Sequence, residues 1–409
     1  MLPKSGLLAP LIHRDFRFLL TSNFLWWQAR WMELIVNGWL ALEMTDSPWM
    51  VALIGFFRSV PTLFVGVFAG PIIDRFGRRA FSLFAQTVAL VVTCVVVVLL
   101  WLDWLGYWQL AGASLLIGSV WGVDWASRRS LIPDLVGKEL SVEAMLLENF
   151  VQNLSSIVGP LLSGTFLALF GGMGGYTLIA LVSGLALAAL LGLSKQPIPK
   201  SAMPDGSPPL QRIAAGLQYI RLNQLLIGVM AVTCIMNFLP FPYDSMLPVF
   251  ARDVLNQGPL GLGILGAASG VGAGIGLFVV NRIRHLFGIQ WIFALGSAFF
   301  CLALLFFSLS TNFYLSLVLL AVAGVGRVCF AVMQTSIILL TASDEMRSRV
   351  MGSLTLFIGA GPFGRLQIGA LAENLGASLA VGMQSGVAII LICLMLVWLP
   401  GYRQAMVRA

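Results

Sequence analysis

Long apolar segments and short polar connections alternate along the whole chain. One polar stretch, residues 195–222, separates the first six apolar segments from the last six. The segments span residues 18–43, 48–70, 80–102, 108–127, 142–170, 174–194, 223–250, 259–280, 288–309, 312–336, 348–372 and 377–400. A bilayer core is about 30 Å thick, and a helix of roughly 20 apolar residues crosses it. The pattern predicts an all-α polytopic membrane protein with twelve spans.

The two sets of six segments resemble each other. Gly159-Pro160 in the fifth segment has a counterpart in Gly361-Pro362 of the eleventh, and the basic loop at 74–79 has a weaker one at 281–285. Internal duplication of this kind is found in repeat-built membrane proteins. We therefore predict two pseudo-symmetric six-helix bundles, 1–194 and 223–409, joined by a cytoplasmic linker at 195–222.

Composition and charge support a multi-pass membrane protein and exclude other classes. Of the 409 residues, 59% are hydrophobic and only 10% charged, whereas soluble domains carry about 25% charged residues. The net charge of +7 would suggest nucleic acid as a partner in a soluble protein. However, nineteen of the 24 Lys and Arg residues fall in predicted loops or tails on one side. Cytoplasmic loops collect such residues, so we expect both termini in the cytoplasm and no nucleic-acid partner.

The residue pattern does not support a metal site, a cofactor site or an enzymatic activity. The five cysteines lie inside apolar segments without paired spacing, and the two histidines stand beside arginines in predicted loops. Nucleophile, His-carboxylate and metal-ligand groupings are lacking. We expect no metal, no cofactor and no enzymatic activity.

The loop between the second and third segments carries the most specific motif. Residues 70–79 read GPIIDRFGRR, which resembles the G-x-x-x-D-R-x-G-R-R signature of the major facilitator superfamily. The resemblance implies that Asp74 caps the helix starting near Ser348 and that Arg78 pairs with Asp124, latching the halves on the cytoplasmic side. An ordinary basic loop is the alternative. The gating residues are Gly70, Asp74, Arg75, Gly77, Arg78, Arg79 and Asp124.

A second motif lies in the fifth segment. Residues 155–164 read SSIVGPLLSG, similar to the G-x-x-x-G-P-x-x-G-G motif of exporter-type members of the superfamily, with serines at two glycine positions. Proline bends a helix and small residues allow close packing. Gly159, Pro160 and Gly164 form this helix-bend motif. A proline kink at a packing contact is the alternative.

Three loop motifs narrow the resemblance to one bacterial branch. Residues 13–17 (HRDFR), 129–136 (RSLIPDLV) and 347–352 (RSRVMG) are similar to the drug- and siderophore-efflux branch, which includes macrolide pumps and the enterobactin exporter. This implies a location in the bacterial inner membrane and function as a monomer in the lipid bilayer.

Polar groups within the apolar segments are the candidates for substrate and proton binding. The first segment contains a stripe of six polar or aromatic residues that fall within an arc of about 120° at helical spacing: Asn23, Trp26, Trp27, Arg30, Glu33 and Asn37. We predict that this stripe lines a water-filled cavity. Polar groups that only tie helices together are the alternative. The candidates are Asn23, Trp26, Trp27, Arg30, Glu33, Asn37, Arg58, Glu148, Gln152, Asn237, Asp244, Arg327, Gln334 and Arg365.

These candidates suggest a function. Intramembrane arginines outnumber deep carboxylates, which favours a small anionic substrate. Glu33 is the first candidate for carrying a coupling proton and Glu148 the second, although either could instead be fixed in an ion pair with arginine. We expect a proton-coupled antiporter that exports an amphipathic metabolite, siderophore or drug. An uptake permease, a lysophospholipid flippase and a non-transporting scaffold or sensor are the alternatives.

Overall fold

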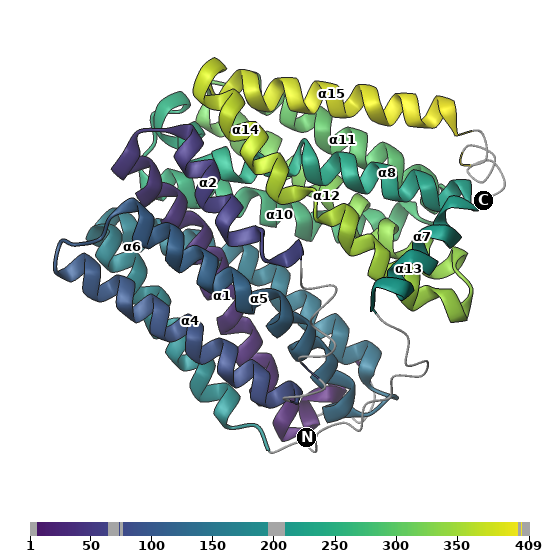
Figure 1. Cartoon of the computed structure of the whole chain (residues 1–409), viewed down its shortest axis with the longest axis horizontal. Coiled ribbons are helices and arrows are strands. Elements are labelled where there is room, and N and C mark those ends of the chain that lie inside the picture. The colour runs from purple at the N-terminus through teal and green to yellow at the C-terminus, as the bar shows by residue number, and fades with distance from the viewer. Residues whose placement is uncertain (1–5, 64–72, 74–76, 195–208, 400–401, 403–409) are drawn as a thin grey trace. The chain divides into compact units, whose positions relative to one another are not determined.

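The computed structural model describes residues 6–63, 73, 77–194, 209–399 and 402. Within these residues the chain is helical and contains no strand, as predicted (Figure 1). The helices of the first half are η1 (Ala9–Ile12), α1 (Arg14–Thr45), α2 (Pro48–Ser59), α4 (Arg78–Trp101), α5 (Tyr107–Val136) and α6 (Ser141–Leu191). Those of the second half are α7 (Pro209–Arg221), α8 (Gln224–Phe238), η2 (Phe241–Met246), α9 (Leu247–Val249), η3 (Phe250–Val254), α10 (Pro259–Ile283), α11 (Ile289–Leu309), α12 (Phe313–Thr341), α13 (Asp344–Ile358), α14 (Gly361–Leu375) and α15 (Ala377–Trp398).

The helices follow the predicted apolar segments. Among the described residues, seven helices are long and apolar enough to cross a membrane. The fifth and sixth segments run together in α6, which is interrupted where Gly171 adopts φ 63° and ψ −162°. A positive φ is accessible to glycine at little cost, so this residue marks the predicted boundary. The eleventh segment is divided into α13 and α14.

The seventh segment departs from a regular helix. α8 ends at Phe238, and a 3₁₀ turn (η2), a short helix (α9) and a π turn (η3) follow. Pro240, Pro242 and Pro248 lie in this stretch, and proline cannot supply the backbone N–H that an α-helix needs. Asn237 and Asp244, seven residues apart in the seventh predicted segment, therefore do not share one face of a continuous helix.

The polar linker contains a helix that we did not predict. α7 begins at Pro209, a residue favoured at the first helical position, and it packs on α13. The Ser353 hydroxyl of α13 donates to the Ile213 carbonyl at 3.2 Å, and a Cβ added at Gly216 would lie 2.3 Å from that hydroxyl oxygen. Apolar residues at 213, 217 and 220 have helical spacing and could have revealed this helix.

The chain forms two compact units. Unit 1 comprises Met1–Thr45, Phe57–Pro204 and Pro259–Gly263, and unit 2 comprises Asp46–Phe56, Asp205–Gly258 and Ile264–Ala409. In unit 1, α1 packs on α5 and α6, and α4 packs on the same two helices (Figure 1). In unit 2, α11 packs on α12 and α15, and α14 packs on α15. The bundle boundaries expected from the sequence remain a prediction.

Glycines bring α10 and α12 into backbone contact within unit 2. A Cβ added at Gly272 would lie only 1.8 Å from the Ala321 carbonyl oxygen, and one at Gly324 would lie 2.3 Å from the Ser269 carbonyl oxygen. Small residues allow this approach in membrane helix pairs. In contrast, a Cβ at Gly274 would meet no atom within 4 Å.

We predict that Gly272→Ala destabilises the protein and that Gly274→Ala does not. The added methyl group at residue 272 would overlap a backbone carbonyl, and overpacking of this kind costs about 1–3 kcal/mol. The thermal unfolding midpoint of the detergent-purified protein should fall for the first variant and stay within error for the second. Equal midpoints for the two variants would contradict the packing described here.

Candidate functional site

Arg128 lies at the centre of unit 1 and is only 2% exposed. Its Nε donates to Asp124 Oδ2 at 2.9 Å, one helical turn earlier on α5. Its Nη1 donates to Ser22 Oγ and Asn23 Oδ1 of α1, each at 3.0 Å, and its Nη2 donates to Gln86 Oε1 of α4 at 3.1 Å. Four of its five N–H groups are thus satisfied. A buried charge requires this degree of pairing.

The position of Arg128 corrects two expectations. We placed residues 128 and 129 in a cytoplasmic loop, but α5 continues to Val136 and Arg128 is buried within it. We also paired Arg78 with Asp124, whereas Arg78 Nη1 forms an ion pair with Asp134 and donates to the Ser130 carbonyl at 3.0 Å. The carboxylate of Asp124 is already bound by Arg128, so Arg78 pairs with the later carboxylate of the same helix.

The rest of the loop motif is only partly described. Gly77 has φ 79° and precedes α4, a conformation that favours glycine. Arg79 Nη2 donates to the Leu191 carbonyl at 3.4 Å. Gly70, Asp74 and Arg75 lie outside the described residues, so the predicted capping role of Asp74 remains a prediction.

Glu148 of α6 is 8% exposed and is held by two donors from α1. Asn23 Nδ2 donates to Oε2 at 2.8 Å, and Trp27 Nε1 donates to Oε1 at 3.3 Å. Because Asn23 also accepts from Arg128, one amide connects the buried arginine to the carboxylate of Glu148.

Glu33 of α1 has a different environment, dominated by cations. Its Oε2 lies 3.3 Å from Arg30 Nη1 and 3.6 Å from Arg58 Nε, while Oε1 accepts from Asn37 Nδ2 at 3.4 Å. The predicted contact between Arg30 and Glu33 is confirmed. Asn37 also donates to Ser114 Oγ at 3.0 Å.

Tryptophan rings and guanidinium groups alternate along α1 and α5. Trp121 stacks on Trp26 and on Trp125, with centroid distances of 5.9 and 6.3 Å and interplanar angles of 2° and 6°. The guanidinium carbons of Arg30, Arg128 and Arg129 lie 4.4, 5.1 and 5.4 Å from the ring centroids of Trp121, Trp26 and Trp125, respectively. These distances are within the range of cation–π attraction.

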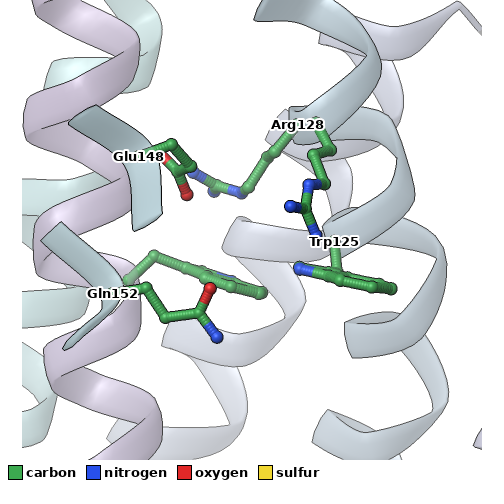
Figure 2. Close-up of a pocket in the computed structure, with 6 residues that line it drawn as sticks. Trp125, Arg128, Glu148 and Gln152 are labelled. Carbon is green, nitrogen blue, oxygen red and sulfur yellow. The ribbon is translucent and has the colours of Figure 1, made fainter. Parts of the chain in front are cut away.

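Two cavities open beside this cluster. One has room for about a single water molecule and is lined by Trp26, Trp125, Arg128, Arg129, Glu148 and Gln152. Figure 2 shows Glu148 and Gln152 projecting toward Trp125 and Arg128. The other is somewhat larger and has Arg30, Glu33 and Trp121 in its wall, and Trp26 borders both. Three residues of the predicted α1 stripe therefore line cavities, and Asn23, Trp27 and Asn37 contact neighbouring helices.

Sequence reasoning missed part of this cluster. Gln86, Trp121, Trp125, Arg128 and Arg129 were not among the candidates. On α5, Trp125 follows Trp121 by four residues, and Arg128 and Arg129 follow Trp125 by three and four. The four therefore share a helical face, which is a signal that the sequence contained. Gln86 stands alone in an apolar segment and is identified only by its contact with Arg128.

A smaller polar group lies in unit 2. Arg365 of α14 forms an ion pair with Asp244 at 3.3 Å. Thr233 of α8 accepts from Gln334 Nε2 through its hydroxyl at 2.5 Å and from Asn237 Nδ2 through its carbonyl at 2.9 Å. The remaining candidate, Arg327, lies over the Phe241 ring at 5.8 Å. The fourteen candidates thus separate into one group in each unit.

The helix-bend motif lies at packing contacts. A Cβ at Gly159 would lie 2.7 Å from the Cβ of Trp31 on α1, and one at Gly164 would lie 2.8 Å from the Cα of Gly263 at the start of α10. Pro160 stands between them inside α6. The small residues therefore allow α6 to approach two other helices closely.

Solved structures share this fold at low sequence identity. A peptide transporter POT in complex with sulfate superimposes with a TM-score of 0.77 at 12% identity, covering 99% of this chain and 98% of the other. A nucleoside transporter NupG gives a TM-score of 0.72 at 13% identity, with 94% and 98% covered. These likenesses show that the chain has the fold of these transporters. More specifically, the chain belongs to the transmembrane secretion effector family, whose model matches residues 5–406.

Curated relatives extend over most of the chain. The multidrug efflux pump Tap of Mycobacterium tuberculosis is 25% identical, covering 84% of each protein. The enterobactin exporter EntS of Shigella flexneri is 25% identical, covering 92% of each. The staphyloferrin A transporter of Staphylococcus aureus is 21% identical, covering 71% of this chain and 72% of that protein.

We predict that Arg128→Met strongly destabilises the protein and that adding Asp124→Leu recovers part of the loss. The single change leaves a buried carboxylate without its counter-charge, which costs about 3–5 kcal/mol, whereas replacing both partners by apolar residues removes that penalty. Arg129→Met is the matched control, since within the described residues the Arg129 guanidinium lies over the Trp125 ring and forms no ion pair or hydrogen bond. Thermal unfolding in detergent should rank the single Arg128 variant lowest. If the loss of stability in the double variant equalled the sum of the losses in the two single variants, the result would contradict the ion pair.

Proposed function

We propose that the protein is a proton-driven exporter of the bacterial inner membrane, with both termini in the cytoplasm. It expels a small amphipathic molecule by alternating access, as a monomer. The family description and the efflux and export functions named for Tap and EntS support the outward direction. The observation that carries the proposal of proton coupling is the hydrogen bonding of Glu148 in the wall of a cavity.

The two partners of Glu148 can only donate to it. Arg128 has no acceptor atom, so the oxygen of the Asn23 amide must face Arg128 and its NH₂ group must face Glu148. The Trp27 indole is likewise a donor only. Each carboxylate oxygen therefore accepts an N–H, which suits the ionised form. In the protonated form one oxygen carries a hydrogen and is a weaker acceptor, so the contact to that oxygen is weakened and can break.

Loss of that contact would affect the wall of the cavity. Asn23 and Trp27 both belong to α1, and Trp26 beside them lines both cavities. Proton uptake by Glu148 would thus loosen α6 from α1 at the cavity wall, and proton release would restore it. Besides its two α1 partners, the charged groups near Glu148 are Arg128 and Arg129 of α5. In this mechanism proton and substrate exclude each other, as antiport requires.

Glu33 is less suited to carry the proton than the sequence led us to expect. Two guanidinium groups and the Asn37 amide surround its carboxylate, and these fixed contacts suit a structural ion pair. We therefore place Glu148 first and give Glu33 the role of fixing Arg30 and Arg58. The arginines near the cavities support an anionic substrate.

We predict that Glu148→Gln reduces pH-driven export at least tenfold, because the amide cannot exchange a proton. Everted vesicles from a strain without its own exporters, made acidic inside, should accumulate an active compound from a panel of drugs and siderophores. Glu33→Gln should retain part of the flux, although it weakens an ion pair. Glu43→Gln is the matched control on α1, since Glu43 also accepts from a tryptophan, Trp39, at 2.6 Å.

The same vesicles test the alternatives. Accumulation only in right-side-out vesicles would establish uptake in place of export. Absence of any compound-dependent flux in either orientation would favour a scaffold or sensor. Undiminished proton-driven flux in Glu148→Gln would overturn the assignment of the coupling carboxylate.

A further inference from the structure

The turn between α10 and α11 lies at the surface of the bilayer. Both helices are long and apolar enough to cross a membrane, and residues 284–288 join them. The 25 residues of α10 extend over about 37 Å at 1.5 Å per residue, whereas the hydrocarbon core is about 30 Å thick. The end of α10 and the turn after it are therefore placed among lipid headgroups. This region contains residues 281–285, the weaker counterpart of the basic loop at 74–79.

Arg282 stands on a face of α10 that the protein leaves uncovered. Phe278, four residues before it, is 81% exposed, and Leu286, four residues after it, is 74% exposed. Helical hydrogen bonding continues into the turn, since the Phe287 amide donates to the Ile283 carbonyl at 3.0 Å. Residues four apart thus stay aligned. Arg282, itself exposed, lies between two apolar side chains on the lipid-facing side.

The arginines at this turn have no acidic partner. Within the described part of the chain, the Arg282 side chain makes no ion pair or hydrogen bond, and the Arg284 side chain only donates from Nε to His285 Nε2 at 3.3 Å. The sequence contains no acidic residue between Asp253 and Asp344, so α10, α11 and α12 carry no carboxylate. The described residues therefore provide no counter-charge for either arginine.

The counterpart loop of unit 1 uses its described arginines differently. Arg78 forms an ion pair with Asp134, and Arg79 donates to the Leu191 carbonyl. Positive charge is common in cytoplasmic loops, so charge alone does not indicate a ligand. Two guanidinium groups that the described residues leave without an anion, on a lipid-facing surface, do indicate one. An arginine there can reach a headgroup while its methylene groups contact acyl chains.

An anionic phospholipid matches both the charged and the apolar part of this surface. The planar N–H fork of arginine fits two phosphate oxygens. Leu286 and Phe287, which is 57% exposed, offer contact to the glycerol and acyl region. Trp291 in the first turn of α11 belongs to a residue type enriched at membrane interfaces. A soluble anion would leave the apolar side chains unused, and a zwitterionic lipid carries a cation that the arginines repel.

We propose that Arg282, Arg284, Leu286 and Phe287 form a surface that binds anionic phospholipid from the surrounding leaflet. In the topology proposed above, this is the cytoplasmic leaflet. The guanidinium groups bind the phosphate, and the two apolar side chains contact the body of the lipid. Binding at this surface requires neither a substrate nor a proton gradient, so it is separate from the proposed export function.

The test compares two lipids that share their acyl chains and differ in the headgroup. Palmitoyl-oleoyl-phosphatidylglycerol is anionic, and palmitoyl-oleoyl-phosphatidylcholine is zwitterionic. Both are added in equal amounts to the full-length protein in detergent, and the bound lipids are counted by native mass spectrometry. An arginine near an anionic membrane surface strengthens binding about fivefold, so phosphatidylglycerol should be retained at least fivefold over phosphatidylcholine. Equal retention of the two lipids would overturn the proposal.

Inorganic phosphate distinguishes a lipid surface from a site for free anions. Phosphate in large excess should displace phosphatidylglycerol no more than chloride does at the same ionic strength. Displacement by phosphate but not by chloride would overturn the assignment to lipid.

Variants assign the preference to this turn. Arg282→Gln/Arg284→Gln should retain the two lipids equally, whereas Arg282→Lys/Arg284→Lys should keep most of the preference because the charges remain. Arg14→Gln/Arg17→Gln is the matched control, because it removes the same charge at the start of α1, where Asp15 lies between the arginines. An equal loss in both glutamine variants would attribute the preference to net charge and refute the surface.

The apolar part of the surface has its own test. Leu286→Ser/Phe287→Ser should lower the retention of both lipids and leave their ratio unchanged. Unchanged retention of both would contradict the contact of these side chains with lipid. All four side chains are exposed, so thermal unfolding midpoints should stay at the wild-type value. If the double glutamine variant loses stability, the single variants Arg282→Gln and Arg284→Gln, each expected to lower the preference, replace it.

The outcome can be separated from that of the proposed function. Transport in vesicles together with equal retention of the two lipids would refute the surface and leave the exporter intact. A preference for phosphatidylglycerol that depends on Arg282 and Arg284, without transport of any compound, would refute the exporter and leave the surface.

Discussion

The arrangement of unit 1 depends on one guanidinium that is almost completely buried. Arg128 donates to α1 and α4 and to Asp124 on its own helix. Two of its acceptors bind α6 in turn, since Gln86 donates to the Ser183 carbonyl at 3.0 Å and Ser22 donates to the Ala186 carbonyl at 2.8 Å. A buried charge tolerates few alternative arrangements, because each lost contact leaves an unsatisfied group. The relative register of four helices is therefore set around this side chain.

The same guanidinium determines how the carboxylate of Glu148 is held. A side-chain amide between two other groups can usually be turned in either direction, but a neighbour that only donates removes this freedom. The orientation of Asn23, and with it the donor that faces Glu148, follows from Arg128. A structural ion pair and the proposed proton-binding group are thus connected through one residue. Glu33 lacks such a connection, because its charge is balanced locally by Arg30 and Arg58.

Hydropathy was sufficient to predict the long apolar helices, since each span must be apolar over the thickness of a bilayer, but it missed α7 in the polar linker. Helical periodicity was sufficient to predict the polar stripe of α1. The partners of individual charges could not be predicted in this way. Asp124 and Asp134 lie on the same helix and are equivalent in sequence, and only packing shows which one Arg78 contacts. Arg128 resembled a loop charge because it stands near the end of an apolar segment, and its pairing one turn away allowed the helix to continue.

The placement of both Glu148 donors on α1 determines the sign of the thermodynamic linkage between proton binding and substrate binding. Neutralising Glu148 would make the surroundings of Arg128 and Arg129 more positive, so electrostatics alone would make a proton and an anionic substrate bind cooperatively. Cooperative binding leads to cotransport, and linkage of this kind is reciprocal. Exchange requires negative linkage, which must come from the shape of the site. In the proposed mechanism a protonated Glu148 would hold α1 less tightly at Trp27, next to Trp26, so the same event that improves the charge of the site would disturb its wall. An exchanger of anions built on this geometry would therefore work by steric coupling acting against its own electrostatics.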